Sequence, residues 1–329
     1  MTAADQMLAR TFTEHRAHLV GVAYRLTSSV ADAEDAVQES WLRLAGLTDA
    51  ARADIRDLRG WLTTVVGRIC LDRLRSAAVR RESYVGSWLP EPVVTSLTST
   101  GEDPLDRVVR DDGVRLAALV VLDHLTPEQR VAFVLHDAFS VPFDEIAAAL
   151  GCTVPSARQH ASRGRKALAD ADPPPRVALE EQRVVLERFL AALASGDLRA
   201  VVALLHPDAV AVGDGGGKVR TAVHRVVGAD KVARFLLGLV AKYRLDPGAV
   251  GVVALVNGDL GLVIPEHPGD GTTQGVPRRV DGLVVRDGLV VALYDVANPD
   301  KIAHVPFTGR PRGTAHPERA RHAESDTSG

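Results

Sequence analysis

Several structural features are scarce in this chain of 329 residues. It contains two cysteines, Cys70 and Cys152, and no uncharged apolar run near the length of about 18 residues that a membrane helix needs. The two thiols lack metal-ligand spacing, which excludes a disulfide framework and a cysteine-based zinc site. The N-terminus also lacks the apolar core of a signal peptide. We therefore expect a cytoplasmic protein without a membrane partner.

An overall positive charge is missing as well, because the formal net charge is -3. The charges are nevertheless segregated along the chain. Residues 29–39 contain four acids and no base, whereas residues 56–81 contain seven arginines and two aspartates. Such segregation indicates separate surfaces for separate partners rather than a uniformly basic coat.

Proline is absent from the first 89 residues, so the strongest helix breaker is missing there. Apolar residues in this part recur at helical spacing, as in Leu19, Val22 and Leu26. We predict an all-helical domain over residues 5–83. Residues 84–104 lose the helical period and gain Gly, Pro, Ser and Thr, which predicts a linker.

A second helical unit is predicted over residues 105–170, and residues 126–168 contain its clearest pattern. An apolar stripe at helical spacing runs from Phe143 to Leu150, and a turn beginning with Gly151 follows. Thr153 or Ser156 can cap the next helix. That helix carries only basic charges: Arg158, Arg163, Arg165 and Lys166. A short helix, a tight turn and a basic helix are typical of a helix-turn-helix whose second helix enters the major groove of DNA.

The chain changes character after the three prolines at 173–175. A helical pattern is followed by short apolar runs that are separated by turn signals, such as Asn257-Gly258 and Asp287-Gly288. We predict an α+β domain with a curved sheet over residues 177–305. Residues 306–329 are polar and poor in apolar residues, which is typical of a disordered tail.

Three parts of the chain resemble known families. Residues 32–41 and 59–75 resemble regions 2.2 to 2.4 of bacterial sigma factors, and residues 126–168 resemble region 4. Nothing between them resembles region 3, which is the layout of the extracytoplasmic-function (ECF) sigma factors. Residues 195–209 resemble the opening of SnoaL-like domains, which have the NTF2-like cone fold. The implied architecture is two all-α sigma domains followed by an α+β NTF2-like cone.

Three short motifs are similar to those of the sigma-J-like subgroup, which carries such a fused domain. They are Trp88-Leu89-Pro90-Glu91-Pro92, Asp214-Gly215-Gly216-Gly217-Lys218 and Asn298-Pro299-Asp300-Lys301. The glycine-rich motif lacks the spacing of a phosphate-binding loop, and its glycines allow close approach by another segment. We expect the second and third motifs to contact the first and the DNA-binding domains, so that the fused domain regulates activity in cis.

The resemblance implies core RNA polymerase as a partner, through the β′ clamp helices and the β flap. The polymerase-binding residues would be Asp32, Glu34, Asp35, Glu39 and Trp41. The acids would face basic residues of the clamp helices. A solvated acidic helix face is the alternative interpretation, and for Trp41 packing in the core is the better one.

Promoter DNA is the second implied partner. The −10 element would meet Arg68, Asp72, Arg73, Arg75 and Arg80. Arginines there can neutralise phosphates, and Asp72 either accepts from a base or pairs with Arg68 or Arg75. The −35 element would meet Ser156, Arg158, Gln159, Ser162, Arg163, Arg165 and Lys166. Arginine reads guanine and glutamine reads adenine, whereas Arg165 and Lys166 are better suited to phosphates.

The third domain offers candidate acids and bases but no recognisable catalytic pair. The candidates are His206, Asp214, His224, Tyr243, Tyr294 and Asp295. Tyr294 and Asp295 alternate along a strand, so only one of them can face the cone interior. We expect no enzyme activity and no cofactor or metal, and we leave open a small-molecule ligand in the cone. The competing interpretations are a helix-turn-helix regulator that acts without polymerase and a DNA-tethered SnoaL-like cyclase or isomerase.

Overall fold

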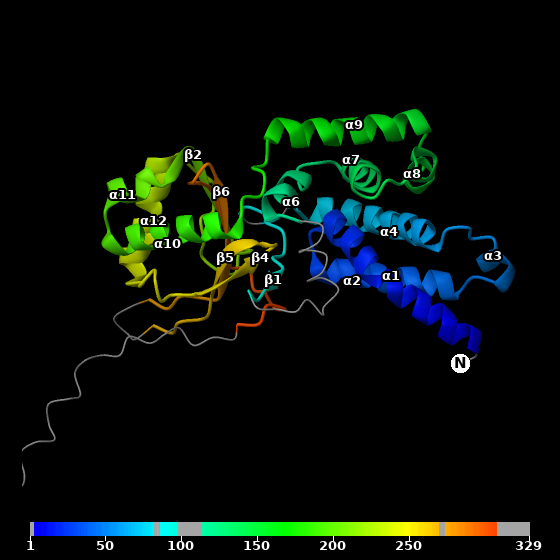
Figure 1. Ribbon diagram of the computed structural model, residues 1–329, viewed down its shortest axis with the longest axis horizontal. Coiled ribbons are helices and arrows are strands. Elements are labelled where there is room, and N and C mark those ends of the chain that lie inside the picture. Colours follow the sequence, from blue (N-terminus) through cyan, green and yellow to red (C-terminus); the bar gives the residue numbers. More distant parts are fainter. Residues whose placement is uncertain (1–2, 82–83, 85, 98–113, 270–273, 308–329) are drawn as a thin grey trace, which may run out of the picture.

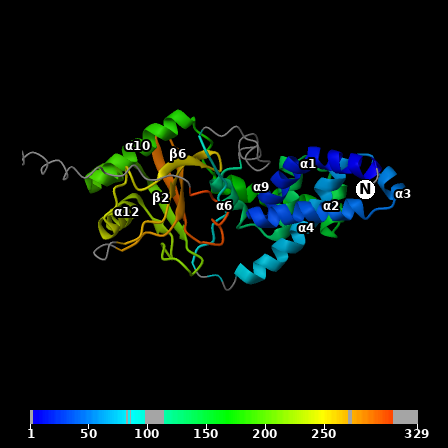
Figure 2. The same cartoon turned by 90° about the horizontal axis from the view of Figure 1, so that it is seen from below.

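The computed structural model describes residues 3–81, 84, 86–97, 114–269 and 274–307, and for residues 3–5 and 78–81 only the backbone. The tail expected from residue 306 lies outside this part from residue 308 onward. A helical half and a half built on a sheet lie side by side, and the short helix α6 (Leu116–Leu122) lies between them in both views (Figures 1 and 2). Among the described residues, no helix has both the length and the apolarity to cross a bilayer.

The helical half contains the helices predicted over residues 5–83 and 105–170, as far as the structure describes these ranges. Residues 82–83 and 105–113 lie outside the described residues. Its elements are α1 (Ala3–Thr27), α2 (Val30–Ala45), α3 (Asp49–Ala53), α4 (Leu58–Arg81), α6 (Leu116–Leu122), α7 (Pro127–Phe133), the π-helix η1 (Val134–Ala138), α8 (Phe143–Leu150) and α9 (Val154–Ala171). The helix-turn-helix is confirmed as α8 and α9. Gly151 ends α8 in the left-handed conformation, and Thr153 caps α9 by accepting from the backbone N–H of Ser156 at 3.3 Å.

One hydrophobic core spans both helical units. Leu19 and Leu62 of the first unit and Leu135 and Ile146 of the second belong to the same cluster of buried side chains. At Gly67 in α4, a Cβ atom would lie 2.7 Å from Leu135 Cδ1, so the two units meet closely there. The sequence patterns predicted two separate helical units, whereas the structure packs them as one body.

The second half contains three helices and one sheet. Its elements are α10 (Leu179–Ser195), α11 (Leu198–Ala203), β2 (Leu205–Asp214), β3 (Val226–Val227), α12 (Ala229–Tyr243), β4 (Val252–Val256), β5 (Asp259–Ile264), β6 (Arg279–Arg286) and β7 (Leu289–Val296). The order in the sheet is β1-β4-β5-β6-β7-β2-β3, where β1 is Val94–Thr95 of the linker, and among the described strands only β2 and β7 pair in parallel. The hairpins predicted at Asn257-Gly258 and Asp287-Gly288 are confirmed.

The linker takes part in the sheet. Strand β1 (Val94–Thr95) pairs with β4, with Val94 opposite Val256. Leu89 is 1% exposed, and it packs with Leu116 of α6 against the sheet face that turns away from α10 and α12. Burying one such leucine stabilises a fold by roughly 1.5–3 kcal/mol. The described part of the linker is therefore a structured connection between the two halves.

Candidate functional site

The acidic surface on α2 lies beside an arginine that the sequence assigned to DNA. Glu34 and Asp35 are exposed, whereas Asp32 and Glu39 are half-buried. Arg73 Nη1 of α4 lies 3.0 Å from Asp32 Oδ1 and 3.5 Å from Asp35 Oδ2, and its Nη2 lies 3.9 Å from Glu39 Oε2. Arg73 therefore ties α4 to α2 and is engaged by acids rather than directed to solvent.

The two tryptophans of this region serve packing. Trp41 lies with its ring centroid 5.1 Å from that of Phe12, and it packs against the helical core. Trp61 packs against the same core. The position of Trp41 agrees with the core interpretation, but its half-buried ring also lines a groove with Glu34 and Asp35, so a partner on this face can reach it together with the acids.

One part of α4 is exposed to solvent, and another part contacts the second helical unit. Arg68 and Asp72 are exposed. Arg75 Nη2 lies 2.9 Å from Glu128 Oε1 of α7, and Thr64 donates to Glu145 Oε2 of α8 at 3.0 Å. Arg75 thus pairs with α7 rather than with Asp72. Arg80 lies in the last turn of α4, where side chains are outside the described residues.

The recognition helix α9 presents its predicted base-reading residues to solvent. Arg158, Gln159, Ser162, Arg163 and Lys166 are exposed, Ser156 is half-buried, and Ala157 and Ala161 face inward. Arg165 makes a bidentate ion pair with Asp137, at 2.8 and 3.0 Å. Arg165 would have to leave this acid before it could hold a phosphate.

A buried arginine joins the two helical units, and the sequence patterns did not single it out. Arg130 is 1% exposed, and it donates to the backbone oxygen of Arg25 at 2.8 Å and to Ser28 Oγ at 2.6 Å. It also pairs with the neighbouring Asp123. Because a buried charge is costly unless it is paired and hydrogen-bonded, this set of bonds holds α7 on the end of α1.

The three motifs meet at one buried carboxylate. Asp214, at the end of β2, is 0% exposed. Its Oδ2 accepts from Lys301 Nζ at 2.7 Å and from the backbone N–H of Leu89 at 2.8 Å. Its Oδ1 accepts from the hydroxyl of Tyr84. Burial raises the pKa of Tyr84, and the hydrogen bond to Asp214 raises it further. One carboxylate thus joins the linker to the end of the sheet.

Lys301 and Gly216 complete this contact. Lys301 Nζ lies 3.2 Å from the ring centroid of Trp88 and donates to the backbone oxygen of Leu89. A desolvated cation over an aromatic ring is worth about 2 kcal/mol or more. Gly216 has φ 61°, and a Cβ there would lie 2.5 Å from Asn298 Nδ2, so the loop requires glycine at this position. We call the contacts of Asp214, Lys301, Tyr84, Trp88 and Leu89 the linker lock.

The other side of the linker is bonded to the first helical unit. Glu91 accepts from the backbone N–H of Val30 at 2.6 Å, and its own N–H donates to the backbone oxygen of Ser28 at 2.9 Å. The hydroxyl of Tyr24 donates to the backbone oxygen of Glu91 at 2.6 Å. Burial raises the pKa of Glu91 and that of Tyr24. The Trp88–Pro92 motif therefore lies between α2 and the sheet, with bonds to both.

A second junction forms around the β4–β5 turn. Asn257 Nδ2 donates to Tyr24 Oη at 2.8 Å and to the backbone oxygen of Val114 at 3.2 Å. Asp259 accepts from Arg115 Nε at 2.7 Å and from Arg176 Nε at 3.3 Å. The sequence predicted a hairpin here, but no local pattern indicated that its turn would also bond to α1, to the start of α6 and to the segment before α10.

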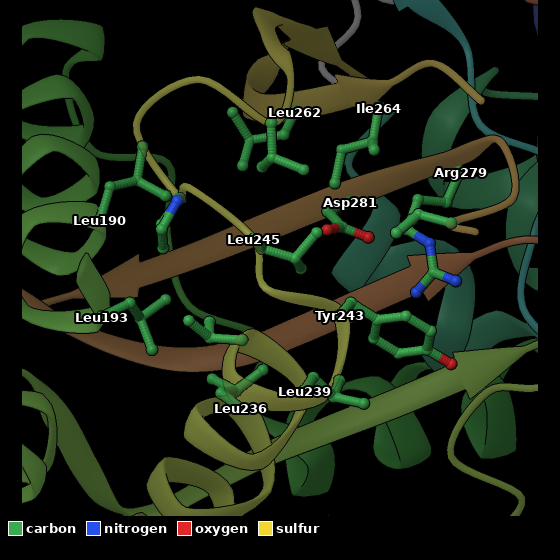
Figure 3. Close-up of a pocket in the computed structure, with 14 residues that line it drawn as sticks. Leu190, Leu193, Leu236, Leu239, Tyr243, Leu245, Leu262, Ile264, Arg279 and Asp281 are labelled. Carbon is green, nitrogen blue, oxygen red and sulfur yellow. The ribbon is translucent and has the colours of Figure 1, made fainter. Parts of the chain in front are cut away.

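The candidate acids and bases of the third domain do not form a catalytic pair. His206 accepts from the backbone N–H of Asp208 in a local turn, and His224 is exposed. Tyr294 is buried with the side chains on the α6 face of the sheet, whereas Asp295 lines a cavity on the other side. Tyr243 lines a neighbouring cavity (Figure 3). Among the described residues, no group of three His, Cys, Asp or Glu side chains has the arrangement of a metal site.

Comparisons with known families divide the chain into three parts. Residues 11–80 match Sigma-70 region 2, residues 115–168 match Sigma-70, region 4, and residues 186–293 match the SnoaL-like domain. These ranges contain α4, the helix-turn-helix and most of the sheet. They correspond to the three families that the sequence motifs resemble.

Individual relatives match over two thirds of the chain or more. The chain is 53% identical over 308 residues to "ECF RNA polymerase sigma factor SigJ" of Mycobacterium tuberculosis, with 91% of this chain and 93% of that protein covered. It is 39% identical over 225 residues to "Probable ECF RNA polymerase sigma factor SigI" of the same species, with 68% and 73% covered. The crystal structure of the M. tuberculosis extracytoplasmic function sigma factor SigJ matches with a TM-score of 0.76 and 49% identity, over 91% of this chain and 99% of that one.

Proposed function

The chain belongs to the ECF RNA polymerase sigma factors with a fused SnoaL-like domain, and from this premise we propose how its residues divide the work of directing transcription. Core RNA polymerase and promoter DNA are its partners. The exposed acids Glu34 and Asp35 contact the β′ clamp helices, with Asp32 and Glu39 beside them. The second helical unit contacts the β flap. The chain acts as a binding protein and not as an enzyme.

Two helices carry the DNA contacts in this proposal. Arg158 and Gln159 of α9 read base edges of the −35 element, with Ser156, Ser162 and Arg163 beside them. Lys166 and, once freed from Asp137, Arg165 hold phosphates. On α4, Arg68, Asp72, Arg73, Arg75 and Arg80 face the −10 element. The exposure of Arg68 and Asp72 supports their roles, whereas Arg73 would first have to leave the acids of α2 and Arg75 would have to leave Glu128.

The fused domain regulates initiation in cis by holding the helical units closed. The linker lock carries this proposal, because it fixes the segment between the two DNA-binding units through a carboxylate that is 0% exposed. In this arrangement α7 and α8 lie along α4, and Arg75 is paired with Glu128. We infer that reading two promoter elements needs the two units to separate, because α7 and α8 cover part of α4 in this arrangement. Opening the linker lock therefore favours the form that binds the promoter.

Run-off transcription with core RNA polymerase tests the function. The template carries the promoter upstream of the protein's own gene, and polymerase is limiting. The wild-type chain is compared with Asp214→Ala, which removes the centre of the linker lock. Lys218→Ala is the matched control, because it removes the ion pair with Asp300 from the same loop, where both side chains are more than half exposed.

We expect initiation with all three proteins and more initiation with Asp214→Ala than with the other two. Equal initiation from all three proteins would contradict regulation through the linker lock and leave the sigma function intact. DNA binding without initiation by any of them would instead favour a helix-turn-helix regulator that acts without polymerase.

A further inference from the structure

Two arginines lie on one face of the recognition helix α9. Arg158 and Arg165 are seven residues apart, which is close to two turns, so their side chains follow each other along the helix axis. Both residues are exposed. In Figure 1 α9 lies above α7, and α8 lies beside the end where α9 begins. The connection between α7 and α8 is therefore a neighbour of α9.

That connection holds both arginines. Arg165 makes its bidentate ion pair with Asp137 of η1. The guanidinium carbon of Arg158 lies 5.6 Å from the ring centroid of Phe143, the first residue of α8. A guanidinium over an aromatic ring is attracted to it when the separation from the centroid is below about 6 Å. An acid thus holds one arginine, and an aromatic ring holds the other.

The ring of Phe143 is itself fixed by a second ring. His136 of η1 stacks on it, with 3.9 Å between the ring centroids and 29° between the planes. The Nδ1 of His136 donates to the backbone oxygen of Val141 at 3.1 Å, which fixes the imidazole. Phe143 also packs against the helical core. The ring therefore gives the exposed Arg158 side chain a rigid support.

The backbone of the connection is irregular where it carries these side chains. η1 is a π-helix, and Ser140 after it has φ 55°, which is unusual for a residue with a Cβ atom. The N–H of Val141 then donates to the backbone oxygen of Leu135 at 3.0 Å. π-Helices and strained residues occur frequently at functional sites. The irregular backbone therefore supports a functional role for the side chains that it carries.

We propose that Phe143, supported by His136, is a positioning residue that holds the guanidinium of Arg158 in the orientation that reads a guanine of the −35 element. This role rests on the proposed function, in which Arg158 reads a base edge. A bidentate contact with O6 and N7 of guanine requires the planar guanidinium in one orientation. A side chain that is held before binding loses less rotamer freedom on binding. Phe143 thus acts on specificity through Arg158.

Phe139 of the same connection provides an internal comparison. Like Phe143 it is half-buried and packs against the helical core. Its ring centroid lies 5.1 Å from the guanidinium carbon of Arg25 and 5.1 Å from the ring centroid of His18, both in α1. Replacing Phe139 therefore removes a comparable ring and leaves the support of Arg158 intact.

Holoenzyme binding to promoter duplexes tests the proposal. The full chain is assembled with core RNA polymerase. Fluorescence anisotropy measures its affinity for the promoter upstream of its own gene and for duplexes in which each −35 base pair is substituted in turn. Arg158→Ala identifies the base pair that Arg158 reads, because substituting that pair should no longer lower the affinity. In the wild type the same substitution should lower it about fivefold or more.

Variants of Phe143 then separate positioning from packing. Phe143→Leu keeps an apolar side chain against the core and removes the ring. It should lower the discrimination at the Arg158 base pair about twofold to fivefold, which is the worth of an exposed cation–π contact, and leave the other base pairs unchanged. Phe143→Tyr keeps the ring and should discriminate as the wild type does. Phe139→Leu is the matched control and should also match the wild type. Phe143→Met takes the place of Phe143→Leu if the latter does not fold.

Nitrogen-15 relaxation of the arginine Nε–H groups tests the positioning without DNA. In the wild-type chain we expect Arg158 to be ordered on the picosecond to nanosecond timescale. In Phe143→Leu it should become more mobile. Arg165 is the internal reference, because its ion pair with Asp137 is unchanged by this substitution.

Three results would overturn the proposal: full discrimination at the Arg158 base pair in Phe143→Leu, equal losses at every −35 base pair, or an Arg158 side chain of the same mobility in both proteins. Equal losses would show that the ring only packs α8. A failure of the proposed function looks different. In that case Arg158→Ala causes no loss specific to one base pair, whereas the relaxation data still show whether Phe143 holds Arg158.

Discussion

Removing the carboxylate of Asp214 should release the linker from the sheet. The side chains of Asp214 and Lys301 are 0% and 4% exposed. Asp214→Ala would leave the Lys301 ammonium buried without its anion and the N–H of Leu89 without its acceptor. Loss of one partner of a buried ion pair costs about 3–5 kcal/mol. We expect a loss of local stability in this range.

A double-mutant cycle measures the part that belongs to the pair. Lys301→Met keeps much of the side-chain volume and removes the charge. In the Asp214→Ala background this second change removes an unpaired charge, so it should restore stability instead of lowering it further. The coupling free energy should then be at least as large as the cost of Lys301→Met alone, about 3–5 kcal/mol.

Fluorine NMR of the chain labelled with 5-fluorotryptophan provides the assay. The chain has three tryptophans, so three signals suffice. Trp88 lies over Lys301 and reports the linker lock, while Trp41 and Trp61 report the helical core. In a urea titration the Trp88 signal of Asp214→Ala should change first. If Lys301→Met lowers the stability equally in both backgrounds, the pair is not coupled and the reasoning is refuted.

Three further outcomes are expected. Gly216→Ala should lower the urea midpoint of unfolding by more than Gly196→Ala does. Both glycines have positive φ, but only Gly216 faces Asn298. Equal shifts of the two midpoints would contradict this prediction. The Asp281→Asn variant should gain stability relative to the wild type as pH rises from 5 to 8. The raised pKa of Asp281 means that the folded wild type loses stability over this pH range, because the carboxyl must ionise while buried. A constant difference between the two melting temperatures from pH 5 to 8 would contradict this prediction. Lys166→Ala should lower the salt dependence of holoenzyme binding to the promoter by about one counterion, and an unchanged slope would remove Lys166 from the phosphate contacts.

Local patterns predicted local structure well. The helix-turn-helix, its Thr153 cap and the two hairpins depend on side-chain periodicity and turn residues, which act between near neighbours. The resemblance correctly indicated the families, and the glycines of the 214–218 motif correctly indicated a close approach by another segment. Gly216 meets Asn298, as a loop without side chains allows.

Long-range partners could not be predicted in the same way. Arg130 binds the backbone oxygen of Arg25, and Asp259 binds Arg115, so each bond joins segments more than 100 residues apart. Nothing in the neighbourhood of either residue encodes its partner. Arg73 was assigned to DNA because it lies in a basic helix, but its nearest anions are the acids of α2. The periodicity of a sequence predicts which residues share one face of a helix. Which side chains that face contacts depends on tertiary packing.

The sheet face opposite α10 and α12 has a consequence for the solubility of a chain that lacks the sheet. Leu89, Leu116 and Ala117 of the sigma half are at most 6% exposed, and they pack in one cluster with residues of this face. A shortened protein that ends at Asp172 would leave these apolar side chains uncovered and prone to aggregation. The helical half therefore depends on the SnoaL-like domain to cover this apolar surface. A shortened variant would need polar replacements on its linker and on α6 to stay soluble.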